Sequence, residues 1–300
     1  MTPDSLGEEG FLRQVRSGLT IRFGPFRICL RSPLLEAARV FRRLYPDIKL
    51  EKDEGIRDFH VEVFPPSGVR RWWRPQVEFR LDGEKPFEPF PRDHAFPLFE
   101  WGLNYAIATR AHNYCLLHSA VLEKNGRCLI LPALPGSGKS TLCAALMLRG
   151  WRLFSDEFGI LQPETGRMLP MPRAIPLKNR SIEVIRRFEP GALLGPLFPK
   201  TRKGDVAHLA PSRSSLERQG EEGKAGWIVF PRFVPGSSTL VSSVSGSEAF
   251  VRLSNNSFNY HLLGEIAFRA LTDLVRESEC HALRYSDLDE AVAMFDRMVG

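Results

Sequence analysis

A glycine-rich segment at residues 133–141 constrains the fold of this chain more than any other feature of its sequence. It reads Ala-Leu-Pro-Gly-Ser-Gly-Lys-Ser-Thr and lies between an apolar run that ends at residue 134 and a helical pattern that ends at Gly150. A buried strand, a glycine loop and a helix N-terminus, in this order, direct backbone N–H groups and the helix dipole at a phosphate group. Ala133 replaces the first glycine of the usual pattern and is small enough for the tight turn. The segment therefore predicts a nucleotide-binding α/β fold.

Each position in this phosphate-binding loop has a chemical reason. Gly136 and Gly138 let backbone N–H groups approach phosphate oxygens. The Lys139 ammonium can neutralise charge on the β- and γ-phosphates, and the Ser140 hydroxyl can ligate Mg²⁺. We expect ATP and Mg²⁺ to be bound here by the following residues: Ala133, Pro135, Gly136, Ser137, Gly138, Lys139, Ser140 and Thr141.

Two adjacent acids, Asp156 and Glu157, follow this helix on a predicted strand at 151–161. The short link predicts a right-handed crossover, so that this strand and the one before the loop both end on the phosphate side. One acid can hold the magnesium shell while the other orients or deprotonates an attacking hydroxyl. We assign metal binding to Ser140 and Glu157. The alternative is a pair of surface carboxylates at a strand end.

A predicted hairpin precedes the loop, because Asn125 and Gly126 separate two apolar strands and Asn-Gly favours a two-residue type I′ turn. That turn fixes the register, in which facing residue numbers sum to 251. His118 then lies opposite Ala133, beside the phosphate-binding loop, where an imidazole could contact a phosphate or assist Asp156 with a proton. The alternative is a histidine packed on the other face of the sheet.

The sequence between residues 117 and 160 resembles the catalytic domain of HPr kinase/phosphorylase. The similarity lies in the histidine before the hairpin, the glycine of its turn, the SGKST loop, the helix that ends in Arg-Gly, and the acid pair. Segments at 173–182, 201–211, 229–237 and 257–271 are similar to the branch described as HprK-related kinases. Two features depart from the parent family: Glu157 replaces an aspartate, and an acidic-Asn-x-Arg-Gly segment associated with dephosphorylation is absent from the C-terminal third.

This resemblance implies a phosphoenolpyruvate-carboxykinase-like P-loop fold with a mixed sheet, and it implies phosphorylation of a protein serine. We therefore expect an ATP-dependent kinase that transfers the γ-phosphoryl group to a hydroxyl, that of a serine in a protein or peptide. Phosphorylase activity does not follow from the resemblance. The alternatives are a nucleotide hydrolase that acts as a switch, and a nucleotide-binding scaffold without turnover. We expect catalysis to depend on four residues: Asp156, Glu157, His118 and Lys139.

Basic residues after the acid-bearing strand are further candidates. Arg173, Lys178 and Arg180 lie in a proline-punctuated segment that could cover the nucleotide and clamp the transferring phosphoryl group. The alternative is a set of solvated cations before a helix. Residues 201–226 are polar and predict a long loop, in which Lys203 and His208 are the candidates nearest the chemistry. The segment 258–275 predicts one amphipathic helix with a core stripe of Phe258, Leu262, Ile266, Leu271 and Leu274.

Residues 1–110 differ from the remainder in pattern. Short alternating runs at 19–30 and 59–81 predict strands, and residues 32–45 and 97–111 predict helices. We therefore expect a small α+β N-terminal domain at 1–110, a candidate partner-binding module, before a catalytic domain at 111–300.

Composition limits the compartment and the partners. No apolar stretch is long enough for a bilayer span and the acidic start is unlike a secretory signal, so we expect a cytoplasmic protein without membrane contact. Five scattered cysteines predict buried thiols rather than disulfides or a zinc site. The 41 Lys and Arg against 35 Asp and Glu favour anionic partners such as nucleotides. Nucleic acid is not expected, because single-strand binding requires basic residues interleaved with aromatics. A homo-oligomer is possible.

Overall fold

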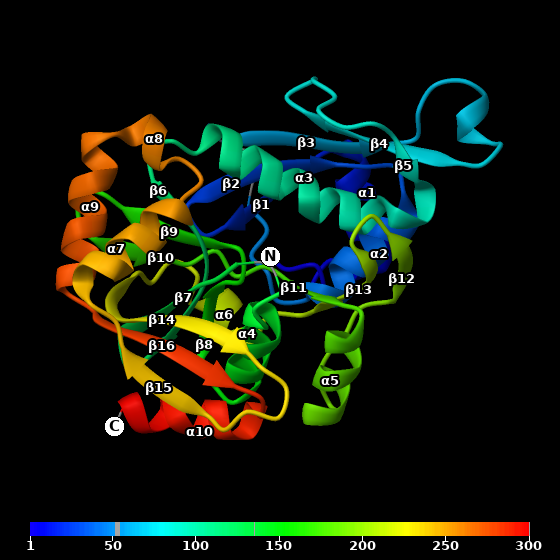
Figure 1. Ribbon diagram of the computed structural model, residues 1–300. Helices are drawn as coiled ribbons and strands as arrows, with labels where there is room; N and C mark the ends of the chain where they lie inside the picture. The colour runs from blue at the N-terminus through cyan, green and yellow to red at the C-terminus, as the bar shows by residue number, and fades with distance from the viewer. Residues whose placement is uncertain (52–54, 135, 300) are drawn as a thin grey trace.

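The computed structural model describes residues 1–51, 55–134 and 136–299. Its N-terminal region contains a five-stranded sheet in the order β1-β2-β3-β4-β5. The strands are β1 (Leu19–Phe23), β2 (Phe26–Arg31), β3 (Phe59–Phe64), β4 (Gln76–Leu81) and β5 (Phe90–Pro91). Three helices pack against this sheet: α1 (Gly7–Ser17), α2 (Leu35–Leu44) and α3 (Ala95–Arg110). The sheet and helices confirm the α+β character expected of this region (Figure 1).

A larger mixed sheet forms the centre of the remaining chain, in the order β10-β9-β6-β7-β14-β16-β15, with β8 also paired to β6. Its strands are β6 (Cys115–Lys124), β7 (Arg127–Pro132), β8 (Arg152–Ser155), β9 (Phe158–Gln162), β10 (Arg167–Leu169), β14 (Gly223–Phe233), β15 (Leu240–Ser243) and β16 (Glu279–Tyr285). β14 runs parallel to both β7 and β16, whereas β6 is antiparallel to β7, β8 and β9.

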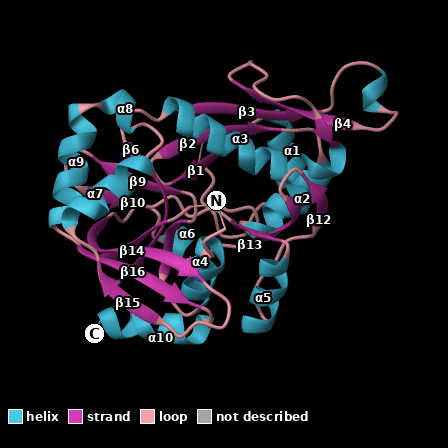
Figure 2. Ribbon diagram, in the orientation of Figure 1, coloured by secondary structure: helices cyan, strands magenta, loops and turns pink. Residues whose placement is uncertain are grey.

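Helices cover both faces of this sheet (Figure 2). On β7, Leu129 and Leu131 pack with one set of helices, and Cys128 and Ile130 pack with the other. The first set comprises α4 (Lys139–Leu148), α5 (Arg180–Phe188) and α10 (Leu288–Val299), and the second α7 (Gly246–Asn255) and α9 (Glu265–Arg276). Because successive side chains of a strand face opposite sides, a strand covered on both faces is apolar on both, as β7 is from Cys128 to Pro132. The fold is thus mixed α/β.

Residues 198–217 correct one expectation. The polar segment predicted as a long loop instead forms β12 (Phe198–Thr201), β13 (Gly204–Leu209) and the short helix α6 (Arg213–Glu217), and β13 pairs with β11 (Ile175–Lys178) in a third sheet. Polar residues occupy the exposed side of this hairpin, while Val206, Ala207 and Leu209 are buried. The apolar signal was too short to stand out against the surrounding charges.

The expected helix at 258–275 is also different in the structure. It is divided into α8 (Tyr260–Leu263) and α9 at Gly264, whose φ of +53° breaks the helical path. Leu271 and Leu274 are buried as predicted, but Phe258, Leu262 and Ile266 are 41%, 71% and 56% exposed. The predicted core stripe is therefore wrong in its N-terminal part, since the break changes which side faces the sheet.

The N-terminal region packs directly on the rest of the chain. α3 ends at Arg110, where we expect the domain boundary, but apolar residues from both sides of it form one cluster. The Phe96 and Phe198 rings stack with their centres 6.2 Å apart, and the Tyr45 hydroxyl accepts the Ala174 N–H at 2.8 Å. This contact brings α3 to the candidate site described below.

Two further expectations concern the state of the cysteines and the presence of membrane-spanning helices. All five cysteines are free, and Cys115, Cys128 and Cys143 are buried. Within the part of the chain that the structure describes, no helix is both long and apolar enough to cross a bilayer.

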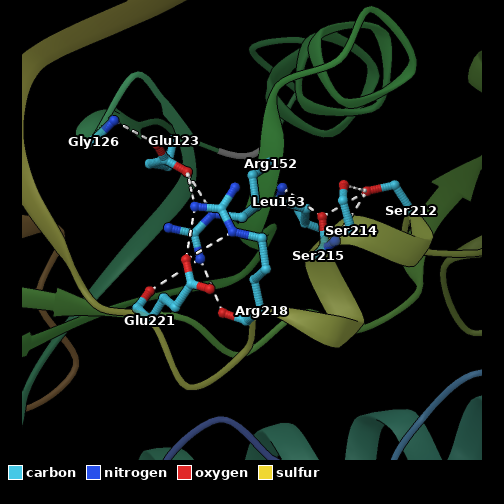
Figure 3. A network of polar contacts seen from close by, with 9 residues as sticks. All are labelled: Glu123, Gly126, Arg152, Leu153, Ser212, Ser214, Ser215, Arg218 and Glu221. Atoms are coloured by element: carbon cyan, nitrogen blue, oxygen red, sulfur yellow. Dashed lines mark hydrogen bonds and ion pairs between the residues drawn. The ribbon is translucent and has the colours of Figure 1, made fainter.

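A buried ion pair joins β6 to β8 (Figure 3). Glu123 and Arg152 are 4% and 5% exposed, and Arg152 also donates hydrogen bonds to the backbone carbonyls of Arg218 and Glu221, each at 3.0 Å. The other carboxylate oxygen of Glu123 accepts the Gly126 N–H at 2.6 Å. The pair thus fixes the hairpin turn and the strand that leads to the acid pair.

Glu123→Gln is expected to lower the free energy of unfolding by about 3 kcal/mol, because it leaves the Arg152 guanidinium buried without its counter-charge. Urea unfolding followed by circular dichroism measures the difference. The control is Glu265→Gln, which removes an exposed pair with Arg269 and should cost less than about 0.5 kcal/mol. Equal losses in both variants would show that the buried pair is not a major source of stability.

Candidate functional site

The phosphate-binding loop lies between β7 and α4, as predicted. Gly136 and Gly138 have φ of +85°, a conformation that favours glycine. A Cβ on Gly138 would also lie 2.5 Å from the Tyr285 hydroxyl oxygen, so a side chain cannot be accommodated there. Pro135 lies outside the described residues.

Two neighbouring strands hold the loop in place. The Ser137 carbonyl accepts the Phe233 N–H at 2.9 Å, and the Tyr285 hydroxyl donates to the Gly138 carbonyl at 3.1 Å. Phe233 ends β14 and Tyr285 ends β16, so the two strands parallel to β7 support the loop at the same edge of the sheet. Sequence reasoning missed both residues, since neither belongs to a motif with recognisable spacing.

Lys139 and Ser140 both contact Asp156. The Lys139 ammonium donates to the Asp156 backbone carbonyl, and the Ser140 hydroxyl donates to Asp156 Oδ2 at 2.9 Å. Lys139 and Asp156 are 8% and 5% exposed, and Asp156 Oδ1 is buried with no hydrogen-bond partner among the described residues. The structure therefore brings the first turn of α4 and the first acid into direct contact, as the crossover predicted.

The acid pair lies in a break between two strands, which corrects the expectation of one continuous strand. β8 ends at Ser155 and β9 begins at Phe158, and both pair with β6. The Ser155 hydroxyl accepts the N–H groups of Glu157 at 3.3 Å and Phe158 at 3.0 Å, and so stabilises the break. Asp156 and Glu157 form a bend that belongs to neither strand, and both line one pocket. Two adjacent carboxylates can therefore both reach the site.

Glu157 faces His118 across β6 and β9. The distance from His118 Nε2 to Glu157 Oε1 is 3.6 Å, and the Phe258 ring lies edge-on to the imidazole at 5.5 Å. The predicted hairpin register is confirmed from Lys124–Arg127 to Ser119–Pro132. The expected pairing of His118 with Ala133 falls one step beyond this ladder. There the His118 N–H donates to the Asn256 carbonyl at 2.6 Å, and on the other edge of β6 His118 pairs with Phe158, next to Glu157.

The two acids have opposite electrostatic environments. Burial raises the pKa of Asp156 above its usual value, an effect that Lys139 opposes. Burial would also raise the pKa of Glu157, but the His118 imidazole and the Lys139 ammonium outweigh it and lower that pKa to about 2. Glu157 is therefore an anion at neutral pH, whereas burial makes the charged form of Asp156 less favourable.

This contrast predicts opposite effects of two substitutions on stability, measured with EDTA present. A lowered pKa stabilises the fold above the ordinary value of 4.5, and this contribution is lost as the pH falls toward 2. Glu157→Gln should therefore lower the free energy of unfolding at pH 7 by on the order of 1 kcal/mol, because its partly exposed side chain is screened. A raised pKa acts in the other direction, so Asp156→Asn should increase stability at pH 7.

Urea unfolding of both variants and the wild type, at neutral pH and at acidic pH values where the fold persists, tests this pair. Relative to Asp156→Asn, the wild type should gain stability as the pH falls, and relative to Glu157→Gln it should lose stability. Shifts of the same sign for both variants would contradict the assignment of environments.

A narrow pocket of about 30 Å³ adjoins the acid pair and is partly lined by the N-terminal region. Glu100, Trp101 and Asn104 of α3 form one wall, which sequence reasoning missed because a helix so distant in the chain carries no local signal.

Arg173, predicted as a phosphoryl clamp, instead binds Glu100 at 2.5 Å and Asn104 at 2.6 Å, and both members of the Arg173–Glu100 pair are buried. Its charge is already neutralised. Arg180 begins α5, is exposed and does not line the pocket.

Lys178, Lys203 and His208 do line this pocket. Within the described residues neither lysine has a carboxylate within ion-pair distance, and burial together with Lys178 lowers the pKa of Lys203. His208 is 1% exposed between the Phe96 and Phe198 rings, and burial lowers its pKa to about 4. We conclude that the lysines can meet an anion, whereas His208 is a neutral packing residue.

A larger cavity of about 850 Å³ opens on the other side of the phosphate-binding loop. Its lining includes Ala133, Gly136 and Ser137 of the loop, the end of β14, and Arg252 and Arg284. This volume is in the range of small-molecule clefts, and the cations suit an anionic ligand. The loop therefore separates a roomy cavity from the narrow acidic pocket.

The donors at the loop suit Mg²⁺. Ser140 Oγ and the carboxylate of the anionic Glu157 are oxygen ligands, which this ion prefers. No group of three or more His, Cys, Asp or Glu able to hold a metal occurs among the described residues. Mg²⁺ in phosphate-binding loops uses one or two protein ligands together with substrate phosphates and water, so the residues fit that mode.

Comparisons with profiles of known protein families and with curated protein sequences found no match.

Proposed function

We propose that this chain is an ATP-dependent kinase that transfers the γ-phosphoryl group to a hydroxyl, of a serine in a protein or peptide. The observation that carries the proposal is the contact of Lys139 and Ser140 with Asp156, with Glu157 and His118 alongside. A phosphate-binding loop alone is common to many nucleotide-binding proteins. Here the lysine and the serine of the loop contact Asp156, and Glu157 is the next residue. Carboxylates are therefore available to orient or deprotonate an acceptor hydroxyl.

The proposed fold is a phosphoenolpyruvate-carboxykinase-like P-loop domain. Two features support it: β7, β14 and β16 are parallel and meet at the loop, and β6, β8 and β9 add an antiparallel part that carries the acids. This mixture differs from the repeated βαβ units of doubly wound folds. The resemblance to HPr-kinase-like proteins at 117–160 points in the same direction.

ATP would occupy the cavity of about 850 Å³ with its phosphates along the loop. The acceptor hydroxyl oxygen would form a bond to the γ-phosphorus as the bond from that phosphorus to the bridging oxygen of ADP breaks. The hydroxyl proton would pass to Asp156, whose Oδ1 has no partner among the described residues and whose raised pKa suits proton transfer. Lys139 would stabilise charge on the phosphates.

Ser140 and Glu157 would hold Mg²⁺, which neutralises charge on the β- and γ-phosphate oxygens. His118 would orient Glu157 through the contact at 3.6 Å. Lys178 and Lys203 would attract the anionic transition state from the acceptor side.

The decisive experiment incubates the purified chain with γ-³²P-labelled ATP, Mg²⁺ and an arrayed library of serine-containing peptides. Label on peptides, alkali-labile as phosphoserine is, supports the kinase. Release of free phosphate with no labelled peptide or protein favours the hydrolase instead. Nucleotide binding by calorimetry without either product favours the scaffold, and absence of binding contradicts all three.

A further inference from the structure

An exposed loop with three arginines and two tryptophans extends from the N-terminal sheet. It connects β3 to β4, reads Ser-Gly-Val-Arg-Arg-Trp-Trp-Arg-Pro at residues 67–75, and every residue in it is exposed. The loop, with the short helix η1 (Val69–Arg71), projects beyond the strands at the upper right of Figure 1. Our expectation that basic and aromatic residues are not interleaved overlooked this segment, which we call the Arg–Trp loop.

The side chains of this loop are exposed and do not contribute to the hydrophobic core. Trp72 and Trp73 are 79% and 59% exposed, although tryptophan is usually well buried. The Arg70 and Arg74 guanidiniums lie 5.4 and 5.1 Å from the centre of the Trp73 ring, and Arg71 lies 5.2 Å from that of Trp72. In the described part of the chain no carboxylate pairs with these three arginines. The loop thus presents positive charge on aromatic surface.

A cavity of about 850 Å³ lies beside the Arg–Trp loop, and two of the loop arginines line it. Arg70 and Arg74 form one rim, and Val40, Phe96 and Phe198 contribute apolar surface. Glu36 and Asp93 also line it, and Glu36 is paired with Arg92 at 3.4 Å. The cavity therefore offers apolar contact in its interior and cations at its rim.

This cavity is one side-chain layer from the acid pair. Phe96 and Phe198 stack on each other and both contact the His208 ring, at 5.1 and 6.1 Å between ring centres. His208 in turn lines the pocket of Asp156 and Glu157. A polypeptide bound in the cavity would lie close to the proposed transfer site.

We propose that the Arg–Trp loop and this cavity bind an acidic segment of a partner polypeptide that also carries apolar side chains. Such a segment can place carboxylates on Arg70, Arg71 and Arg74. Its apolar groups can pack against the accessible apolar lining of the cavity, Val40, Pro75 and Pro91. A single-stranded nucleic acid fits less well, since Glu36 and Asp93 would repel a continuous phosphate backbone. A flat bilayer would not fill the cavity. The identification of this segment with the phosphoryl acceptor rests on the proposed function, but its binding does not.

The test measures fluorescence anisotropy of a fluorescein-labelled peptide of alternating Glu and Leu, without nucleotide. We expect binding that weakens with salt, and a loss of at least about tenfold in affinity for Arg70→Glu/Arg74→Glu and for Trp72→Ala/Trp73→Ala. The matched control is Arg269→Glu/Arg276→Glu on α9, which should bind as the wild type does. A Gln–Leu peptide should bind at least about tenfold more weakly.

Loop variants that bind the Glu–Leu peptide as well as the wild type would overturn the proposal. So would binding of oligothymidylate or phosphatidylglycerol vesicles in preference to the peptide. The docking site and the kinase fail separately: loop-dependent peptide binding without transfer to any peptide of the serine library would refute only the kinase, and phosphorylation unchanged in the loop variants would refute only the identification of the bound segment with the acceptor.

Discussion

Lys139→Met is expected to weaken the binding of Mg-ATP by at least about a hundredfold and to remove phosphoryl transfer. The Lys139 ammonium is the single cation that the phosphate-binding loop places at its base, and a lost charge-assisted contact of this kind costs 2–5 kcal/mol in typical cases. Methionine retains most of the aliphatic length. Calorimetric titration with Mg-ATP measures the affinity.

Burial makes a folding control necessary for this variant. The Lys139 side chain is buried and donates to the Asp156 carbonyl, so its removal can also lower the stability of the fold. Circular dichroism must therefore show a native spectrum before the affinity is compared. Lys224→Met, at an exposed position on β14, is the matched control and should bind as the wild type does. A folded Lys139→Met protein with wild-type affinity would remove the basis of the nucleotide site.

Asp156→Asn is expected to retain Mg-ATP binding within a fewfold and to reduce transfer by about a thousandfold. The amide keeps the shape of the side chain and can still accept the Ser140 hydroxyl, but it cannot accept a proton. An interaction used only in the transition state lowers kcat without raising KM. Initial rates of label transfer at several ATP concentrations separate the two constants.

Asp273→Asn, on the exposed side of α9, is the control and should leave both constants unchanged. Near wild-type kcat in Asp156→Asn would show that Asp156 takes no proton, and Glu157 would become the candidate. If KM rose by the same factor while kcat stayed unchanged, Asp156 would instead contribute to binding of the substrate in the ground state.

The phosphate-binding loop and the hairpin before it could be predicted because their signals are local. Two glycines with positive φ, a lysine at the helix start and an Asn-Gly turn each act within a few residues. The turn fixed the register of β6 and β7 from Lys124–Arg127 to Ser119–Pro132. The position of Asp156 could also be predicted, because the crossover between Lys139 and Asp156 is short.

The opposite wall of the site could not be predicted, because long-range packing decides it. Nothing near Arg173 in the sequence indicates that Glu100 neutralises it, and nothing near Gly138 indicates Tyr285. The break at the acid pair depends on two backbone N–H groups that donate to the Ser155 hydroxyl oxygen, which a periodic pattern of apolar residues does not reveal. Gly264, which divides the α8–α9 segment, was visible in the sequence but was read as part of one helix.

The ion pair between Glu100 and Arg173 makes the two regions of this chain interdependent. Arg173 is buried, so the region after residue 110, separated from α3 or joined to another N-terminal region, would hold an uncompensated charge beside its own acids. An exchange of N-terminal regions between chains of this architecture would have to supply a carboxylate at the position of Glu100, or replace Arg173 with a neutral residue. The chain is therefore better regarded as one inherited unit than as two interchangeable modules.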